Sequence, residues 1–275
     1  MLDHFLKNVH SQFGEDGVLE AILRVLPSSD KWCVEFGAWD GRYLSNACHL
    51  IDSNGFSAVL IEADPKKFKQ LTANFSKNRK VLPICKFVGW KNHTLDEILA
   101  DTPIPLDFDF LSIDVDGNDY HIWEAVRRYV PKIVCIEFNP TIATGIDFVQ
   151  PKDASSIQGA SLSALVGLGK SKGYALVAVT RNNAIFVRDQ YFLLFDIPDN
   201  SPDKLRVDCS WVTHIFWGMD GEPVILGNQV IPWHGIRIER MVRKTPGILR
   251  GFPPSMPWWK RKALGLWKRV FRLGA

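Results

Sequence analysis

"CVEFGAWDGRYLSN", residues 33–46, joins a short apolar strand to a turn that contains two glycines and an aspartate. Glycine turns after the first strand of a parallel sheet usually bind phosphate, because their backbone N–H groups can approach it closely. Here the dinucleotide pattern G-x-G-x-x-G is replaced by Gly37-x-x-x-Gly41. Carboxylates at Glu35 and Asp40 place negative charge where a phosphate would sit. The stretch therefore favours a ligand that is cationic and has no phosphate.

The first 200 residues alternate apolar strand patterns with helical patterns. Strands are expected at 32–38, 57–63, 80–89, 108–115, 132–138, 174–180 and 184–189. Helices are expected at 16–26, 43–54, 65–77, 95–100, 119–129 and 160–172. Near-continuous apolar strands separated by helices are typical of a parallel sheet covered on both faces. Only "RNN" separates the last two strands, which is a hairpin signal. We therefore expect an α/β, Rossmann-like sheet of seven strands, mostly parallel with an antiparallel edge strand.

The composition indicates the compartment. Hydrophobic residues make up 46% of the chain and charged residues 23%, as in ordinary globular proteins. No apolar run reaches the roughly 18 residues of a membrane-spanning helix, and the first residues lack the apolar core of a secretory signal. The five cysteines are odd in number and scattered, which favours free, buried thiols in a reducing compartment. We expect a cytoplasmic protein.

Three segments of different composition follow one another along the chain. Residues 1–196 carry the strand and helix pattern, and 197–257 form an irregular extension rich in Pro, Gly and Trp, with one possible strand at "WVTHIFWG" (211–218). Residues 258–275 form a basic amphipathic helix. From residue 237 onward there are eleven Lys or Arg and one Glu, a local charge of +10 in a chain of net charge +3. The acidic body and basic tail predict a partner for the tail.

Acidic residues follow four of the expected parallel strands. They are Glu35 and Asp40, Glu62 and Asp64, Asp114 and Asp116, and Glu137. Ligands of such sheets bind outside the carboxyl ends of the strands. S-adenosylmethionine (SAM) has an ammonium, a sulfonium and a ribose diol but no phosphate, and carboxylates suit all three. We therefore expect SAM as the cofactor, with Glu62 on its ribose. Asp64 precedes Pro65 and is expected to cap the next helix instead.

Five motifs in this order resemble the FkbM-type SAM-dependent methyltransferases, over about residues 10–190. The motifs are "SQFGEDGVLEAIL" (11–23), "VEFGAWDG" (34–41), "VLIEADP" (59–65), "FLSIDVDGNDYHIW" (110–123) and "IEFNP" (136–140). The resemblance implies a class I methyltransferase fold and, commonly, O-methylation of sugar hydroxyls in glycans or natural products. In one respect the chain differs: the family loop often reads D-V-G-A-N-x-G, whereas Glu35 and Trp39-Asp40 stand here.

The cofactor contacts are expected from the strand ends and from the segment before the first helix. They are Gln12, Glu35, Gly37, Ala38, Asp40, Gly41, Glu62, Ala63 and Asp114. The glycines have a simpler interpretation as a plain strand-to-helix turn. The segment "SQFGEDG" (11–17) can likewise be interpreted more simply, as a helix start with carboxylates in the first turn. Alternatively, Gln12 or Glu15 could reach the cofactor from this segment.

The catalytic residues are expected at the ends of the fourth and fifth strands. They are Asp114, Asp116, His121 and Glu137. Oxygen ligands from Asp114, Asp116, Glu137 and Asn139 could hold Mg²⁺, which would lower the pKa of a bound sugar hydroxyl. Without a metal, one carboxylate or His121 would be the general base. His121 could equally be an ordinary surface residue, and Asp119 is expected to cap the helix that follows.

The tail has one apolar face and one basic face. Over residues 258–273, a helix would place Trp and Phe with aliphatic residues on one half and only Lys and Arg on the other. Such a helix fits the surface of an anionic membrane; the alternative is docking on this domain or on a second subunit. Nucleic acid is not expected, because the body is acidic. A peripheral position at the inner membrane face would suit a carbohydrate or glycolipid acceptor.

Two other functions stay open from the sequence. One is an NAD-dependent oxidoreductase on the same type of sheet. The other is a non-catalytic, membrane-associated binding module that keeps the fold, against which the intact acidic strand ends argue.

Overall fold

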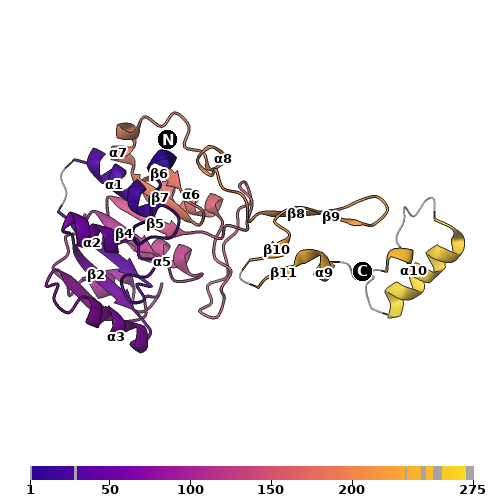
Figure 1. Ribbon diagram of the computed structural model, residues 1–275, viewed down its shortest axis with the longest axis horizontal. Coiled ribbons are helices and arrows are strands. Elements are labelled where there is room, and N and C mark those ends of the chain that lie inside the picture. The colour runs from indigo at the N-terminus through magenta and orange to yellow at the C-terminus, as the bar shows by residue number, and fades with distance from the viewer. Residues whose placement is uncertain (1, 28–29, 233, 243–245, 250–255, 271–275) are drawn as a thin grey trace. The chain divides into compact units, whose positions relative to one another are not determined.

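The computed structural model describes residues 2–27, 30–232, 234–242, 246–249 and 256–270. The chain divides into two compact units, Met1–Cys209 and Ser210–Ala275. The first unit contains a seven-stranded sheet with helices on its two faces (Figure 1).

The seven strands confirm the α/β sheet expected from the sequence. Their bounds are β1 (Trp32–Phe36), β2 (Ser57–Glu62), β3 (Val81–Cys85), β4 (Phe110–Ile113), β5 (Ile133–Glu137), β6 (Tyr174–Val179) and β7 (Asn183–Arg188). The strand order is β3-β2-β1-β4-β5-β7-β6. The first five strands are parallel to their neighbours, and β7 is antiparallel to both β5 and β6. The expected hairpin therefore closes one edge, with its antiparallel strand one position inside that edge.

Two apolar clusters pack on opposite faces of this sheet, because successive side chains of a strand point to opposite sides. Val34 and Phe36 of β1 belong to the cluster that includes residues of the helices that begin at Leu95, Asp119 and Leu162. Cys33 belongs to the other cluster, which includes residues of the helices that begin at Glu15, Cys48 and Pro65. The helices of this unit are α1 (Glu15–Val25), α2 (Cys48–Asn54), α3 (Pro65–Asn74), α4 (Leu95–Leu99), α5 (Asp119–Ala125), α6 (Leu162–Ser171), α7 (Asp189–Phe192) and α8 (Pro202–Leu205), with 3₁₀ turns η1 (Leu2–Phe5) and η2 (Leu193–Phe195).

Local capping explains where several helices begin. The side chain of Asp64 accepts hydrogen bonds from the backbone N–H of Lys66 (2.7 Å) and Lys67 (3.2 Å), so its expected role as the cap of α3 is confirmed. Thr94 and Glu97 form a reciprocal capping box at the start of α4.

Two helices are much shorter than the sequence pattern predicts, because side chains capture nearby backbone N–H groups. The pattern at 119–129 ends as a helix at Ala125, since Asp96 accepts from the backbone N–H of Arg127 (2.7 Å) and Arg128 (2.9 Å). The pattern at 43–54 becomes helical only at Cys48, and the residues before it form a turn.

The second unit consists of short strands and two further helices. Its elements are β8 (Thr213–Trp217), β9 (Pro223–Gly227), β10 (Val230–Ile231), β11 (Ile236–Arg237), α9 (Ile238–Val242), the 3₁₀ turn η3 (Gly247–Leu249) and α10 (Trp258–Val270). β8 and β9 form an antiparallel hairpin, and β8 confirms the strand expected within 211–218. None of the helices in the described part of the chain is both long and apolar enough to cross a bilayer.

Candidate functional site

The candidate site lies between β1 and β4, where the order in which the strands follow one another across the sheet reverses. These strands are parallel neighbours, with Phe36 opposite Ile113. The next strand after β1 in sequence, β2, lies on one side of this pair, and β5, the next after β4, lies on the other. Diverging connections of this kind open a crevice at the carboxyl ends of the strands, where ligands of α/β sheets bind.

The two glycines of the turn are required by close packing. Gly37 has φ +74°, and a Cβ there would lie 1.7 Å from the carbonyl oxygen of Asp114. Gly41 has φ +75°, and a Cβ there would lie 2.5 Å from atoms of Leu71 and Phe75. The turn thus contacts the end of β4 on one side and the region of α3 on the other. This explains the spacing of the glycines without a phosphate.

Glu62 links the turn after β1 to the end of β2. The side chain is buried, and its oxygens accept hydrogen bonds from the backbone N–H of Trp39 (2.8 Å) and of Asp64 (2.7 Å). Each carboxylate oxygen has a further lone pair, so the group keeps acceptor capacity for a ligand. Ala63, beside it, is exposed, whereas Ala38 is buried.

Glu35 holds the segment that leads into α2. Its carboxylate is buried and accepts from the backbone N–H of Asn46 (2.8 Å) and the hydroxyl of Ser45 (2.5 Å). The amide of Asn46 in turn donates to the hydroxyl of Ser112 on β4 (3.1 Å). Burial raises the pKa of Glu35 to about 7, against the opposing effect of its hydrogen bonds. Sequence reasoning missed Ser45 and Asn46, because it placed both in a helix.

The raised pKa of Glu35 predicts a pH dependence of stability. Between pH 4.5 and about 7 the folded protein holds more protons on this group than the unfolded chain, so the free energy of unfolding falls as the pH rises through that range. Each pKa unit corresponds to about 1.4 kcal/mol, so Glu35 alone accounts for on the order of 3 kcal/mol. Glu35→Gln mimics the protonated acid and is expected to raise the melting temperature at pH 8 and to leave it unchanged at pH 4.5.

Thermal unfolding of both proteins across this pH range measures the effect. Glu20→Gln, at a partly exposed ion pair, is the matched control and should change stability little at either pH. A Glu35→Gln variant that is less stable than the parent at pH 8 would contradict the assignment.

Asp40 shapes the turn. Its Oδ1 accepts from the backbone N–H of Arg42 (2.9 Å) and of Tyr43 (2.7 Å). This is an Asx turn, a common local use of aspartate.

The segment before α1 is fixed by two buried carboxylates. Glu15 accepts from the hydroxyl of Thr180 (2.5 Å) and the amide of Asn183 (3.1 Å), which fastens the start of α1 to the β6–β7 hairpin. One oxygen of Asp16 accepts from the backbone N–H groups of residues 9–11. The side chain of Gln12 is exposed. The sequence offered Gln12 or Glu15 as the residue that reaches the cofactor from this segment. In the structure the carboxylate of Glu15 is hydrogen-bonded to Thr180 and Asn183 within the protein.

Three carboxylates converge at the ends of β4 and β5. Asp114, Asp116 and Glu137 each offer an oxygen, and these oxygens lie within 4.8 Å of one another. Asp116 is exposed and has φ +57°, a backbone conformation uncommon outside glycine. The amide of Asn182 donates to Glu137 (3.0 Å). Asn182 lies in the "RNN" turn, where the sequence was interpreted only as a hairpin signal.

Burial and mutual repulsion change the acidity of this group. Burial raises the pKa of Asp114 well above its ordinary value, and the charges of Glu137, Asp119 and Asp116 add to the shift. Burial likewise raises the pKa of Glu137 to about 8. Carboxylates this close either share protons or bind a cation. The group is therefore suited to proton transfer near neutral pH, or to holding a divalent ion.

Two residues near these carboxylates, Asn139 and Asp119, have hydrogen-bond partners elsewhere. The amide oxygen of Asn139, expected among the metal ligands, accepts from both the backbone N–H (2.9 Å) and the hydroxyl (2.6 Å) of Thr141. Asp119 accepts from the backbone N–H of Val115 (2.9 Å) and of Gly117 (2.8 Å), so it fixes the turn before α5.

His121 is buried, so its interpretation as a surface residue is wrong. Its Nε2 lies 2.8 Å from the carbonyl oxygen of Gln150, and its Nδ1 has no hydrogen-bond partner among the residues that the structure describes. Its ring also contacts Trp90 and Tyr120. Among the described residues, His121 therefore contacts Gln150, Trp90 and Tyr120 rather than the carboxylates at the ends of β4 and β5.

Among known proteins, this chain is similar only to solved structures, and at low sequence identity. No family model matches the sequence, and no curated protein matches it. The N-terminal domain of EvdMO1 with SAH bound aligns with 63% of this chain and 79% of its own, at 10% identity and a TM-score of 0.42. TrmK of M. capricolum, in complex with S-adenosyl-homocysteine (SAH), aligns with 62% of this chain and 65% of its own, at 12% identity and a TM-score of 0.37. A SAM-dependent methyltransferase from Aquifex aeolicus aligns with 67% of this chain and 94% of its own, at 10% identity and a TM-score of 0.40.

These likenesses say nothing about the reaction or substrate of this chain, which we infer from its own residues. The resemblance to the FkbM-type family stays a prediction.

Proposed function

We propose that this chain is a SAM-dependent methyltransferase that methylates a sugar hydroxyl of a glycan or lipid-linked saccharide. The observation that carries the proposal is the acidic edge of the sheet. Asp114, Asp116 and Glu137 converge beside a glycine turn whose packing needs no phosphate. Negative charge there favours a sulfonium and an ammonium and disfavours the diphosphate of NAD. The sugar acceptor is supported by the motif resemblance.

The chain's own residues supply binding and proton transfer. SAM supplies the methyl group and leaves as SAH. Glu62, at the end of β2, would hold the ribose hydroxyls of SAM with the lone pairs that Trp39 and Asp64 leave free. Glu137, whose pKa of about 8 lies near physiological pH, would take the proton of the acceptor hydroxyl and so make the hydroxyl oxygen a better nucleophile for methyl transfer. Alignment of the two reactants contributes much of the remaining rate enhancement.

A divalent ion fits the same carboxylates. Asp114, Asp116 and Glu137 would hold Mg²⁺ through oxygen ligands, and the bound ion would lower the pKa of the acceptor hydroxyl. The amide oxygen of Asn139 would join them only by giving up the hydrogen bonds that it accepts from Thr141.

Transfer of labelled methyl from SAM to glycan and lipid extracts tests the function, with calorimetry of SAM and NAD binding beside it. We expect SAM to bind, NAD to show no binding, and label to enter a carbohydrate-containing fraction. If Mg²⁺ takes part, EDTA should reduce methyl transfer. If EDTA leaves transfer unchanged, a carboxylate acts as the base without a metal. Binding of NAD without SAM would favour the oxidoreductase. Binding of SAM with no transfer to any extract would favour a binding module.

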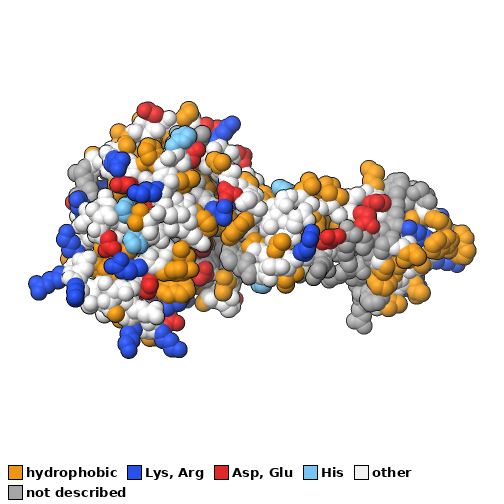
Figure 2. Space-filling model, in the orientation of Figure 1, with side chains coloured by type: hydrophobic (Ala, Val, Ile, Leu, Met, Phe, Trp, Pro, Cys, Tyr) orange, Lys and Arg blue, Asp and Glu red, His pale blue; other side chains and the backbone are white. Residues whose placement is uncertain are grey.

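We further propose that α10 binds an anionic membrane and holds the enzyme peripherally at its inner face. Trp259, Leu266 and Val270 are spaced by seven and four residues, so they share one face of the helix, and their exposed fractions are 50%, 64% and 65%. Figure 2 shows hydrophobic side chains gathered over α10. The helix carries Lys and Arg but no acidic residue. Residues 271–273 of the expected apolar and basic faces lie outside the described part of the chain.

A further inference from the structure

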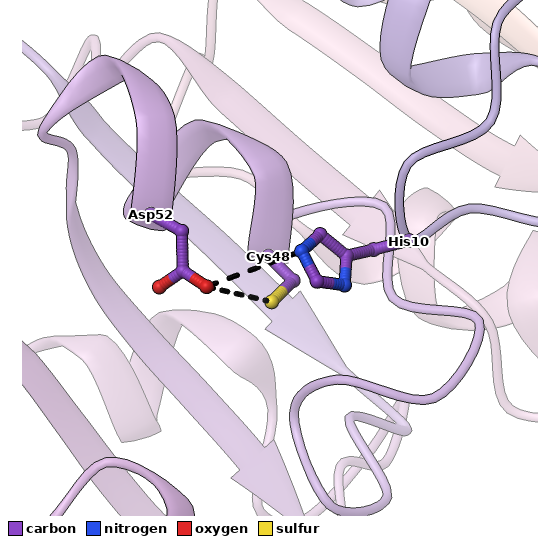
Figure 3. A group of neighbouring side chains, drawn as sticks. All are labelled: His10, Cys48 and Asp52. Atoms are coloured by element: carbon purple, nitrogen blue, oxygen red, sulfur yellow. Dashed lines mark hydrogen bonds and ion pairs between the residues drawn. The ribbon is translucent and has the colours of Figure 1, made fainter.

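Three potential metal ligands of different chemistry meet away from the acidic edge. They are His10, in the segment before α1, and Cys48 and Asp52 of α2, whose ligand atoms lie within 4.8 Å of one another. The Nε2 of His10 and the Sγ of Cys48 are each 3.9 Å from the same oxygen of Asp52. Figure 3 shows the three side chains pointing toward one another.

The local structure fixes the positions of these side chains. Cys48 and Asp52 are four residues apart on α2, so they lie on the same face of the helix. The backbone at His10 is held by the buried carboxylate of Asp16, which accepts from its N–H at 2.7 Å. Two independently fixed segments thus bring the ligand atoms together, which reduces the ordering that a bound ion would require.

We infer that His10, Cys48 and Asp52 form a binding site for Zn²⁺. An imidazole nitrogen, a thiolate and a carboxylate are its usual protein ligands, at about 2.0, 2.3 and 2.0 Å. Neighbouring ligands of a tetrahedral ion are then separated by roughly 3.3–3.6 Å. The two separations from the Asp52 oxygen, 3.9 Å each, therefore need to close by only a few tenths of an ångström. The His10 nitrogen and the Cys48 sulfur lie within 4.8 Å of each other and need to approach by about 1 Å at most. Three protein ligands leave the fourth position for water.

Binding proceeds by exchange of a proton for the metal. Burial and the charge of Asp52 keep the thiol of Cys48 protonated, with its pKa raised to about 12. The sulfur–zinc bond therefore forms as the S–H bond breaks, and the proton passes to water. Side chains with nitrogen and sulfur donors also select Zn²⁺ and Co²⁺ over Mg²⁺.

Arg42 competes with the ion for Asp52. Its guanidinium lies 2.9 Å from the oxygen that both other ligands approach. Both partners of this ion pair are partly exposed, so solvent screens their attraction and the pair is weak. The guanidinium also lies 5.2 Å from the centre of the Phe75 ring, which offers it a second partner when a metal takes the carboxylate.

A zinc ion at this place would fasten the segment before α1 to α2. α2 follows the glycine turn directly, so the ion would stabilise the part of the fold that surrounds that turn. This inference does not depend on the proposed methyl transfer.

Titration of the full chain with Co²⁺ and Zn²⁺ tests the site. We expect Co²⁺ to give a near-ultraviolet sulfur-to-cobalt charge-transfer band, and Zn²⁺ to abolish it by displacement. Cys48→Ser should remove the band. His10→Gln, a change at a partly exposed side chain, should lower the affinity for Zn²⁺ at least 10-fold without disturbing the core. Arg42→Gln should raise that affinity several-fold, because it removes the competing cation.

Thermal unfolding gives a second readout. Zn²⁺ should raise the melting temperature of the parent protein but not that of His10→Gln. Glu137→Gln is the control for the acidic group and should keep the cobalt band. The inference is overturned if the parent protein shows no such band, if the band survives in Cys48→Ser, or if the affinity of His10→Gln for Zn²⁺ equals that of the parent.

Discussion

Replacing Asp114 with asparagine is expected to lower methyl transfer at least about 100-fold, the lower end of what a positioned acid or base contributes. The variant removes one of three carboxylates whose oxygens lie within 4.8 Å of one another. With it goes a ligand for Mg²⁺ or, without the ion, the hydrogen-bonded neighbour that sets the acidity of Glu137, the proposed base. Removal of a like charge from a buried group also relieves repulsion, so the melting temperature at pH 8 should stay the same or rise. Both effects are measured on the same samples. The rate of transfer of labelled methyl from SAM to the carbohydrate-containing fraction gives the first, and thermal unfolding gives the second.

Asp107→Asn is the matched control for this experiment. Asp107 is exposed and lies before β4, at the opposite end of the strand from Asp114. Neither the rate nor the melting temperature should change in this variant. If Asp114→Asn kept the parental rate, the assignment of the acidic group would be wrong. If it lost activity and also unfolded at a lower temperature, Asp114 would be needed for folding instead.

Replacing Trp259 and Leu266 together with serine is expected to lower binding to anionic vesicles at least about 100-fold, because each large apolar side chain contributes roughly 1.5–3 kcal/mol when buried. Both side chains are exposed on one face of α10. Each Lys or Arg near the membrane adds about 1 kcal/mol, so binding of the parent protein should also weaken as the salt concentration rises. Co-sedimentation with vesicles of anionic or zwitterionic lipid measures both effects.

Leu193→Ser is the control, since Leu193 is 85% exposed and lies in the first unit. This variant should bind vesicles as the parent does. Equal binding by the Trp259 and Leu266 double variant would contradict the membrane proposal. A parent protein that ignores vesicles but forms a dimer dependent on the same two residues would favour docking on a second subunit.

The fold was readable from the sequence because its signals are local and repeated. Each strand of the sheet is an apolar run bounded by polar residues, and six helical patterns lie between or beside these strands. All seven strands and six helices occur where the sequence predicts them, with shifted ends. The ends differ where a side chain distant in sequence captures backbone N–H groups, as Asp96 does at the end of α5. A sequence pattern carries no sign of such a contact.

The sequence by itself determined the parallel sheet, the acidic strand ends and the glycine turn between them, because strand direction brings the carboxyl ends to one edge. It also determined that Asp114, Asp116 and Glu137 would lie near one another. Only the tertiary structure decided what each carboxylate does. Glu35 and Asp40 look alike in the sequence, yet the first is buried against Ser45 and Asn46 and the second shapes a surface turn. The meeting of His10 with Cys48 and Asp52 likewise depends on how two segments pack, because the spacing of 38 residues between His10 and Cys48 carries no such signal.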